Sequence, residues 1–517
     1  MDPSDGVVHA VPAQVDAVVV GAGTVGLAAG LLLARQGLTV LIAERRSRMS
    51  VHPRATGINV RTMEIFRSLG LERDVMDASL PADGVPFLLL GESLVGPVRA
   101  TVESTQYQST TPPDWPSPTR AVWCAQDQLD PILTAAVTAE PTATLRMSAE
   151  VVDFRVGGDA VVVEVNNTET GRVDLVTAEY LVAADGPRSA VRRRLGIGVT
   201  GEPNVSDELS ILFRADLAPL LGERRFLLYR VDNDRIRGVV RPAGASDRWF
   251  LGVPGTQDTS VENCADLVRA AVGVADLDVE VLAAGAWHAA AVVADSFGGD
   301  RVFLCGDAAH QHTPGGGFGL NVGIQGAHNL AWKLAGVVRG WAGLGLLDTY
   351  ERERRPVAQL TAELSIEALR AGGARSAKTL GVVLGADYNS SAVLADGTPP
   401  TAVADPVADY EPSARPGQRA PHVWLDRGGD LSTLDLFGRG FVLLTGTARA
   451  WEPAVAAAAG VPVRIEERPP GAWAAAYGVR PDGGVLVRPD GYIAARWPVR
   501  PDDPQQVFGP ALHTLTH

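Results

Sequence analysis

Val15-Asp16-Ala17-Val18-Val19-Val20 is directly followed by Gly21-Ala22-Gly23-Thr24-Val25-Gly26, and a helical pattern of apolar residues comes next. This order predicts a strand, a tight turn and a helix. Gly21 permits the turn, Gly23 lets a pyrophosphate approach the backbone, and Gly26 lets the helix pack on the strand. The free N–H groups at the start of the helix would then face the phosphates. The stretch therefore predicts a Rossmann-like dinucleotide site.

An acidic residue ends the next predicted strand. Gly37 suits a helix stop, and residues 38–43 form a second apolar run that leads to Glu44, twenty-three positions after Gly21 (44 − 21). A carboxylate at this place can accept hydrogen bonds from an adenosine ribose, which favours FAD or NAD over NADP at this site. A glycine-rich turn without a ligand would explain the glycines, but not their agreement with two strands, a helix and a terminal acid.

The same bare glycine pattern occurs a second time, at residues 196–201. There it follows the basic residues Arg192, Arg193 and Arg194 instead of an apolar strand, and no amphipathic helix comes after it. We therefore expect no cofactor at this second match.

The composition is that of a globular protein with two or three domains. The chain has 517 residues, of which 46% are hydrophobic and 21% charged, and its formal net charge is −14. This acidic balance argues against nucleic acid and anionic membranes as partners, because both bind basic surfaces. The three cysteines, Cys124, Cys264 and Cys305, are far apart in sequence, which indicates a reducing compartment. Because we find no signal-peptide pattern and no apolar run long enough to cross a bilayer, we expect a soluble, cytoplasmic protein.

The rest of the chain divides into an α/β part, a mainly antiparallel part and a tail. Residues 208–290 alternate apolar and polar positions, which predicts an antiparallel sheet of a different class from the N-terminal unit. Residues 385–420 are rich in Pro, Ala, Asp and Ser and are predicted to form a linker. Further predicted elements are helices at 60–69, 126–137, 322–338 and 350–369, a hairpin at 151–165, and strands at 180–184, 301–305, 441–444 and 484–487.

Two more predicted strands end in an acid beside a glycine, at Asp185-Gly186 and at Gly306-Asp307. In open α/β sheets ligands bind at the carboxyl ends of the strands, where such carboxylates can bind polyol hydroxyls. Downstream, the glycine run 315–317 lets the backbone press against a flat ring. A helix starting near Asn321 would aim its N–H groups at developing negative charge. Either acid alone reads as a cap or turn residue, but three strand-end sites together predict one large cofactor.

Other site classes find little support. His310-Gln311-His312 lacks further metal ligands at a suitable spacing, so hydrogen-bonded turn histidines are favoured over a metal site. The serine-hydrolase pattern G-x-S-x-G and the phosphate-binding pattern GxxxxGK(S/T) are absent from the sequence.

Three motifs in this order resemble the single-component flavoprotein aromatic hydroxylases, which share the para-hydroxybenzoate hydroxylase fold. They are Gly21-x-Gly23-x-x-Gly26 with Glu44, Asp185-Gly186-Pro187-Arg188-Ser189-x-Val191-Arg192, and Gly306-Asp307-Ala308-Ala309-His310. Residues 53–55 and 61–64 and the tail segments 415–422, 432–438 and 487–492 resemble the subgroup that acts on aromatic polyketides and related large phenols. In that subgroup the tail is a thioredoxin-like domain. Because no cysteine follows Cys305, dithiol chemistry is excluded here, and we expect a structural role.

The resemblance implies three structural parts. These are an α/β FAD-binding Rossmann-like domain, an inserted, mainly antiparallel β-sheet domain (α+β) that binds substrate, and a C-terminal thioredoxin-like domain. The expected ranges are 1–75, 101–190 and 291–385 for the FAD-binding domain, 76–100 and 191–290 for the substrate domain, 386–420 for a linker and 421–517 for the C-terminal domain.

The resemblance also implies non-covalent FAD, with its adenosine end at the first glycine turn. The residues expected to bind FAD are Gly21, Gly23, Val25, Gly26, Glu44, Arg45, Arg54, Gln126, Asp185, Gly186, Asp307, Pro314, Gly317, Gly319, Leu320 and Asn321. The catalytic surroundings of the flavin ring would be Arg54, Pro314, Gly315 and Gly316. The substrate would lie between this ring and the middle sheet, with Tyr229, Arg241 and Trp249 as candidate contacts. Taken singly, each candidate is more often a core aromatic or a solvated charge.

In enzymes of this kind NADPH reduces the flavin, O2 adds to give a C4a-hydroperoxide, and a phenolate ring attacks the distal oxygen. The resemblance therefore implies hydroxylation of a polycyclic, polyketide-type phenol, with NADPH or NADH as transient reductant and O2 as co-substrate. Two alternatives stay open. One is Baeyer–Villiger insertion or oxidative rearrangement of a polyketide ring, and the other is a flavin- or ligand-binding protein without turnover. No metal, nucleic-acid or membrane partner is expected, and the protein would be a monomer or a homodimer.

Overall fold

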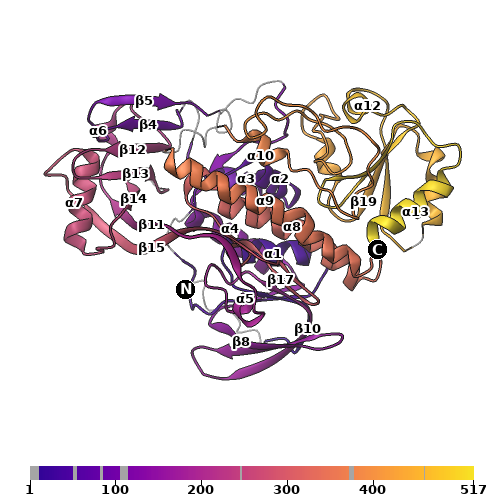
Figure 1. The fold of residues 1–517 in the computed structure, drawn as a ribbon, viewed down its shortest axis with the longest axis horizontal. Coiled ribbons are helices and arrows are strands. Elements are labelled where there is room, and N and C mark those ends of the chain that lie inside the picture. The colour runs from indigo at the N-terminus through magenta and orange to yellow at the C-terminus, as the bar shows by residue number, and fades with distance from the viewer. Residues whose placement is uncertain are drawn as a thin grey trace.

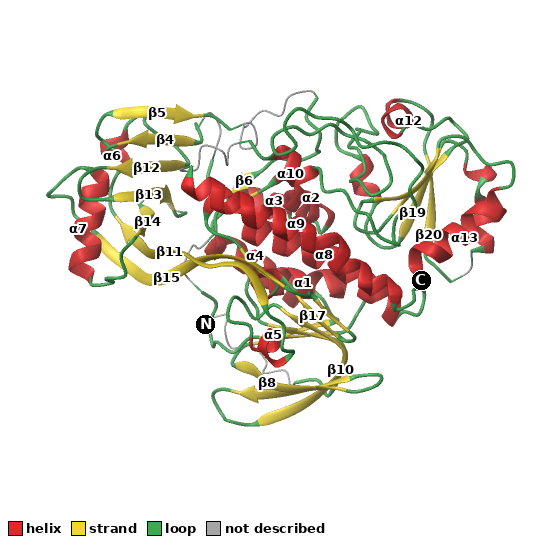
Figure 2. Cartoon of the chain, viewed as in Figure 1, coloured by secondary structure: helices red, strands yellow, loops and turns green. Residues whose placement is uncertain are grey.

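Three parts lie side by side in the molecule (Figure 1). The computed structural model describes residues 11–50, 55–81, 85–104, 114–244, 247–371, 378–458 and 460–517. A central α/β part carries a mainly antiparallel sheet on one flank and a small four-stranded domain on the other (Figure 2). The predicted fold class is confirmed.

The central sheet is mainly parallel. Its order is β16-β17-β10-β1-β2-β7, and every neighbouring pair except β16–β17 is parallel. The strands are β16 (Gly298–Gly299), β17 (Val302–Leu304), β10 (Val173–Ala183), β1 (Gln14–Val20), β2 (Val40–Ala43) and β7 (Ala143–Arg146). The predicted hairpin forms β8 (Ala149–Val156) and β9 (Val161–Asn167), which extend β10. The central strands are rich in valine and leucine because helices or sheet cover both faces.

Helices pack on this sheet and on one another. Helix α1 (Thr24–Arg35) packs against α4 (Gln126–Ala139) and α8 (Phe318–Val338), and α8 packs along α9 (Gly345–Arg370). Shorter helices are α2 (Val60–Ser68), α3 (Glu72–Asp77), α5 (Ala190–Arg194) and α10 (Leu380–Leu384), and β3 (Gly57–Ile58) pairs with β6 (Val122–Trp123). No helix in the described ranges is both long and apolar enough to cross a membrane.

The predicted start of the long helix near residues 321–322 is wrong, because α8 already begins at Phe318. Gly316 and Gly317 have φ angles of 79° and 65°, a conformation that glycine adopts without strain. These two residues complete the turn, so Phe318 and the glycine after it are free to enter the helix. The free N–H groups of α8 therefore lie closer to the glycine run than the sequence indicated.

The second sheet is antiparallel except for the pair β12–β4. Its order is β18-β15-β11-β14-β13-β12-β4-β5. The strands are β18 (His310–Gln311), β15 (Glu280–Ala294), β11 (Val199–Arg214), β14 (Arg248–Pro254), β13 (Arg237–Pro242), β12 (Leu228–Asp232), β4 (Leu88–Gly91) and β5 (Val98–Val102). One face packs under α7 (Val261–Val272), and α6 (Ala218–Leu221) lies at its margin. The second glycine pattern leads into β11, which confirms that no helix follows it.

The C-terminal part has the strand order β20-β19-β21-β22. Strand β19 (Phe441–Thr445) is parallel to β20 (Val463–Glu467) and antiparallel to β21 (Gly484–Val487), which pairs with β22 (Ile493–Trp497). The helices α11 (Glu452–Ala457), α12 (Ala472–Tyr477) and α13 (Pro504–Thr516) accompany it. This mixed order is that of a thioredoxin-like sheet.

The segment 386–420 contains no helix or strand, and all of its residues are described. It is nevertheless packed, since Ala392, Ala414 and Ala420 are buried and the Arg419 side chain is fully enclosed. Its separation from the flanking domains, like the other domain boundaries, stays a prediction.

Candidate functional site

Four parallel strands bring the predicted site segments to one edge of the central sheet. In the register of the sheet, Val20 pairs with Ala183 and with Ala43, and Ala183 pairs with Leu304. The residues that follow these strand ends are the first glycine turn, Glu44, Asp185 and the turn at Asp307. Segments nearly 300 residues apart in the chain therefore meet at the place where such sheets bind ligands.

The first glycine turn is shaped by close backbone contacts. Gly21 has a φ angle of 98°, and a Cβ atom there would lie 2.6 Å from the carbonyl oxygen of Ala184. A Cβ atom on Gly26 would lie 1.9 Å from the carbonyl oxygen of Gly21. Around Gly23, by contrast, no described atom lies within 4 Å of a Cβ position. Gly21 and Gly26 allow backbone segments of the protein to pack closely against each other, whereas Gly23 borders open space, as a pyrophosphate site requires.

Val25 joins this turn to two other predicted segments. A Cβ atom on Gly306 would lie 3.0 Å from Val25 Cγ1, and one on Gly323 would lie 2.6 Å from Val25 Cγ2. The start of α1, the turn after β17 and helix α8 are thus in van der Waals contact.

Glu44 is hydrogen-bonded to the first glycine turn and to the residues that follow β2. Its Oε2 accepts a hydrogen bond from the N–H of Ala22 (2.8 Å), and its Oε1 accepts one from the N–H of Arg46 (3.0 Å). An ionised carboxylate has about four acceptor positions, so capacity for a ribose hydroxyl is left. The neighbouring Arg45 is exposed.

Asp185 has one engaged and one unengaged oxygen. Oδ2 accepts from the N–H of Val191 (3.2 Å), whereas Oδ1 is buried and has no hydrogen-bond partner in the part of the chain that the structure describes. A buried acceptor of this kind is costly unless a further donor pairs with it. A polyol hydroxyl of a bound cofactor fits this requirement.

Arg192 connects two of the sequence motifs, although we did not predict it as a site residue. Its guanidinium donates to the carbonyl oxygen of Ala308 (2.8 Å) and to that of Pro187 (3.2 Å). Burial lowers the pKa of Arg192, against the attraction of Asp185. The signal for this role was its place at the end of the second motif.

Gln126 belongs to a polar cluster at the start of α1. Its Nε2 donates to Asp130 Oδ2 (3.3 Å), and the hydroxyl of Thr24 donates to Asp130 Oδ1 (2.5 Å). Asp130, which is 2% exposed, was not predicted. Its distance of 106 residues from Thr24 left no signal in the sequence.

The glycine run forms a tight turn against α9. A Cβ atom on Gly315 would lie 2.3 Å from the carbonyl oxygen of Ser365, and Gly317 faces open space. Asn321 fixes the turn from the other side. Its Nδ2 donates to the carbonyl oxygens of Gly317 (2.8 Å) and Gly57 (2.9 Å), and its Oδ1 accepts from the N–H of Asn59 (3.0 Å). This side chain is therefore occupied within the protein, and only its backbone is available to a ligand.

The remaining predicted cofactor residues are placed as follows, and their contact with FAD stays a prediction. Asp307 is exposed in the single turn Gly306–Ala308 at the end of β17. Pro314 and Gly316 precede α8 in the chain, and Gly319 and Leu320 lie in its first turn. Gly186 follows the end of β10. Arg54 lies outside the described residues.

His310 and His312 are not turn residues as predicted, although His312 is hydrogen-bonded as expected. They start and follow β18, are enclosed, and lie 5.2 Å apart between ring centres. His312 Nε2 contacts the hydroxyl of Thr361 (2.9 Å), but neither Nδ1 atom has a hydrogen-bond partner among the described residues. Burial lowers the pKa of His312 to about 4 and that of His310 as well, so both rings are neutral. No group of three metal-ligating side chains occurs in the described ranges.

The three substrate candidates lie on opposite faces of the second sheet. Tyr229 and Trp249 belong to the core under α7, and the Tyr229 hydroxyl donates to the carbonyl oxygen of Arg224 (2.8 Å). Arg241 lies on the other face, where its guanidinium stacks over the ring of its cross-strand neighbour Phe250 at 4.0 Å. Asp127, at the start of α4, contributes an attraction that raises the pKa of Arg241, but burial outweighs it and lowers that pKa to about 9.

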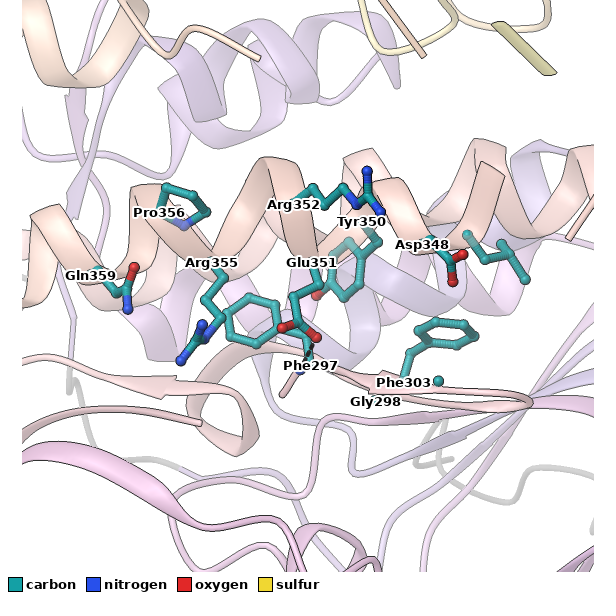
Figure 3. Close-up of a pocket in the computed structure, with 12 residues that line it drawn as sticks. Phe297, Gly298, Phe303, Asp348, Tyr350, Glu351, Arg352, Arg355, Pro356 and Gln359 are labelled. Atoms are coloured by element: carbon teal, nitrogen blue, oxygen red, sulfur yellow. Dashed lines mark hydrogen bonds between the residues drawn. The ribbon is translucent and has the colours of Figure 1, made fainter. Parts of the chain in front are cut away.

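A surface groove occurs at a different place from the ligand-binding edge of the central sheet, and Figure 3 shows the residues that line it. It has a volume of about 390 Å³ and lies between α9, the edge strand β16 and its neighbour β17. Glu351 closes one wall by accepting from the N–H of Phe297 and the hydroxyl of Ser296, both at 2.9 Å. None of the predicted site residues that the structure describes lines it.

Two family models match the chain. The FAD binding domain family matches residues 14–365, and the C-terminal part of aromatic-ring hydroxylases matches residues 413–515.

Full-length similarity extends to proteins of known activity. Tetracenomycin B2 monooxygenase-dioxygenase of Streptomyces olivaceus is 39% identical, over 96% of this chain and 98% of that protein. The 4-methyl-5-nitrocatechol 5-monooxygenase of Burkholderia sp is 38% identical, over 97% of both. Among solved structures, a ternary complex of aklavinone-11 hydroxylase with FAD and aklavinone is 34% identical, with a TM-score of 0.88 over 98% of this chain and 100% of that one.

Proposed function

Because the chain belongs to the FAD-dependent aromatic-ring hydroxylases, we propose that it is an NADPH-consuming monooxygenase that hydroxylates a polycyclic, polyketide-type phenol. The observation that carries this proposal is the convergence of the first glycine turn, Asp185 and Asp307 at one sheet edge, where Val25 also contacts α8. Neither a nicotinamide dehydrogenase nor a simple binding domain needs all of these segments together.

The fit of FAD rests on the open space at Gly23 and the unengaged buried oxygen of Asp185. We assign the pyrophosphate to the N–H groups at the start of α1, the adenosine ribose to Glu44, and the ribityl chain to Asp307. When bound, FAD supplies hydride acceptance and activation of O2. The N–H groups in the first turn of α8 would favour negative charge at the flavin end of the site.

On the substrate side, Arg241 and Phe250 are better candidates than Tyr229 and Trp249. Tyr229 and Trp249 pack in the core under α7, whereas Arg241 and Phe250 lie on the opposite face of the sheet. A pKa of about 9 leaves Arg241 cationic at neutral pH although it is buried. A buried cation favours an anionic group nearby, and an ionised phenol is such a group. Phe250, half-buried beside it, offers a ring surface for an aromatic substrate.

One relative favours a second candidate substrate class, since the Burkholderia enzyme takes its name from a substituted nitrocatechol. A monocyclic acidic phenol would use the same cation with a smaller contact area. Baeyer–Villiger insertion or rearrangement would need the same cofactor site and differs only in the product.

The test uses purified protein. Its absorption spectrum should be that of a flavoprotein, and NADPH oxidation should rise with polycyclic phenols more than with a nitrocatechol. Mass analysis and NMR of the product would then separate a new hydroxyl from a ring-inserted oxygen. A protein that cannot be loaded with FAD would refute the proposal, and stimulation by the nitrocatechol alone would refute the polycyclic substrate class.

A further inference from the structure

A stripe of polar side chains runs along α8. Its members are spaced four residues apart, which places them on one face of the helix: Asn321, Gln325, Asn329 and Lys333. Twelve residues of helix span about 18 Å. Asn321, Asn329 and Lys333 are each at most 1% exposed. The stripe begins beside the glycine run and ends against the C-terminal domain, toward which α8 runs in Figure 1.

At the far end, the stripe meets a cluster of buried ions. Glu353 of α9 accepts from Lys333 Nζ (2.7 Å) and from both terminal nitrogens of Arg488 (2.6 and 2.8 Å). Arg488 also pairs with Asp490 (2.5 Å), and Asn329 donates to Glu353 (2.6 Å) and Asp490 (3.2 Å). The four charged side chains are at most 1% exposed.

The same C-terminal residues reach α2. Arg61 donates to the carbonyl oxygen of Asp490 (2.7 Å) and pairs with Glu64 (2.8 Å), and Glu64 pairs with Arg419 (2.5 Å). Arg488 and Asp490 therefore contact three helices: Glu353 of α9, Asn329 of α8 and Arg61 of α2.

At the near end, α2 and α8 are bonded to each other beside the glycine turn. Gln325 Nε2 lies 3.4 Å from Asn59 Oδ1 and 3.5 Å from Thr62 Oγ1. Asn59 caps α2 by accepting from the N–H of Thr62 (3.0 Å), and Asn321 holds Asn59 and the glycine turn together. Any sliding of α8 along α2 would break these bonds and displace the turn.

Buried ion pairs add little net stability compared with apolar packing, but each has only one geometry that satisfies its partners. We propose that Arg488 and Asp490 are positioning residues for the FAD site. Through the polar stripe they set the axial position of α8 against α2, and thereby the placement of the turn at residues 315–321. The inference rests on the proposed FAD site and gives the cysteine-free C-terminal domain a role in that site.

The test compares FAD binding and the spectrum of bound FAD in three single variants, followed by the double variant Arg488→Met/Gln325→Met and by Arg488→Lys. Arg488→Met removes the arginine of the ion cluster at the far end of the stripe, and Gln325→Met interrupts the stripe without removing a buried ion. Arg496→Met is the matched control, because Arg496 pairs with Asp396 of the segment 386–420 (2.6 Å) and, among the described residues, forms no ion pair or hydrogen bond with α8. Fluorescence titration of each apoprotein gives the dissociation constant for FAD, visible circular dichroism reports the surroundings of the ring, and thermal unfolding reports stability.

Both stripe variants should weaken FAD binding by roughly three- to thirtyfold and change the visible dichroism. The dissociation constant of the double variant for FAD should lie within about twofold of that of the weaker-binding single variant, because both substitutions break the same linkage. Arg488→Lys should restore part of the dichroism, and Arg496→Met should lower the thermal midpoint alone. If wild type binds FAD and both stripe variants bind it identically, this inference fails while the proposed function stands. If Arg488→Met does not fold, Gln325→Met decides the matter alone. A wild type that binds no FAD would refute the proposed function itself.

Discussion

At the scale of single residues, the site is defined by which positions have room for a side chain. Gly21 and Gly26 are glycines because the protein's own carbonyl oxygens lie within 2.6 Å of a Cβ position, whereas Gly23 is surrounded by open space. The motif alone predicted these three roles, since strand-turn-helix geometry is local. It did not reveal Asp130, whose partner Thr24 is 106 residues away, or the cation–ring pair at Arg241, which depends on the pairing of β13 with β14.

Gly23→Ala should therefore separate cofactor binding from folding. With φ of −66° and ψ of 171° an alanine is unstrained here. The free energy of unfolding of the apoprotein should therefore lie within about 1 kcal/mol of that of wild type. The added methyl would occupy the pyrophosphate space, and FAD binding should weaken at least about tenfold. The measurement is FAD titration beside thermal unfolding. Gly158→Ala, which also meets no atom within 4 Å but lies in the β8–β9 turn, is the matched control. Unchanged FAD affinity in Gly23→Ala would contradict the assignment of the turn.

Arg241→Met should raise KM for the phenolic substrate by about tenfold or more, because a charge-assisted contact is worth roughly 1.5–3 kcal/mol. Because the substitution also removes the contact with the Phe250 ring, thermal unfolding of the variant is measured beside its kinetics. Arg237→Met, on the same strand but in an exposed pair with Asp232 (3.2 Å), should leave KM unchanged. Steady-state kinetics with the best phenol gives the answer, and equal KM values in both variants would remove Arg241 from the substrate site.

At the scale of elements, the sequence predicted which segments are strands and helices better than how they face one another. Alternation placed Tyr229 and Trp249 in strands of an antiparallel sheet, but a period of two does not say which face meets the cofactor domain. The structure shows that this face carries Arg241 and Phe250. The early start of α8 was missed because helix propensity disfavours glycine, whereas Gly319 lies in the first turn of this helix.

Arg192 tests how two elements are coupled at the sheet edge. Arg192→Met leaves the carbonyl oxygens of Ala308 and Pro187 without this donor, which should cost about 1–3 kcal/mol of unfolding free energy and weaken FAD binding about tenfold. Arg194→Met on the same short helix removes only an exposed pair with Asp153 (3.2 Å) and should change neither quantity. Denaturant unfolding and FAD titration measure both effects. Similar behaviour of the two variants would show that the coupling is unimportant.

At the scale of the whole molecule, the C-terminal domain is joined to the centre by charges that are distant in the chain. Glu64 and Arg419 are 355 residues apart, and Glu353 and Arg488 are 135 apart. Charged residues are usually solvated, so nothing local marked these as buried. The shared core around Trp332 and Phe441 adds ring contacts at 5.8 Å between the two parts. The domain is accordingly an integral part of the fold.

The buried carboxylates make stability fall in acid. Burial alone would raise the pKa of Glu353, but Arg488 and Lys333 outweigh it and hold that pKa below the ordinary value of 4.5. Arg488 in the same way lowers the pKa of Asp490 against burial. The unfolded chain thus binds more protons than the folded one, and this stability, complete above pH 4.5, is lost as the pH falls toward the lower folded values.

Glu353→Gln should lower the unfolding free energy by about 3–5 kcal/mol at neutral pH, because Arg488 and Lys333 lose their shared anion. As the pH falls below 4.5, the free energy of unfolding of Glu353→Gln should decrease less steeply than that of wild type, by up to about 1.4 kcal/mol per pH unit. Denaturant titrations at several pH values measure this slope. Glu280→Gln, in an exposed pair with Arg214, is the control and should keep the wild-type slope. Parallel pH curves for wild type and Glu353→Gln would contradict the described linkage.

The central claim is that this chain uses FAD to transfer one atom of O2 to an aromatic ring. The most direct test is to incubate the FAD-loaded protein with NADPH and the best polycyclic phenol under ¹⁸O2, and to determine the mass of the product. The account predicts a product that is heavier than the substrate by one oxygen atom, with that atom labelled. NADPH consumption that yields only hydrogen peroxide with every phenol, or a product whose new oxygen is unlabelled, would contradict it.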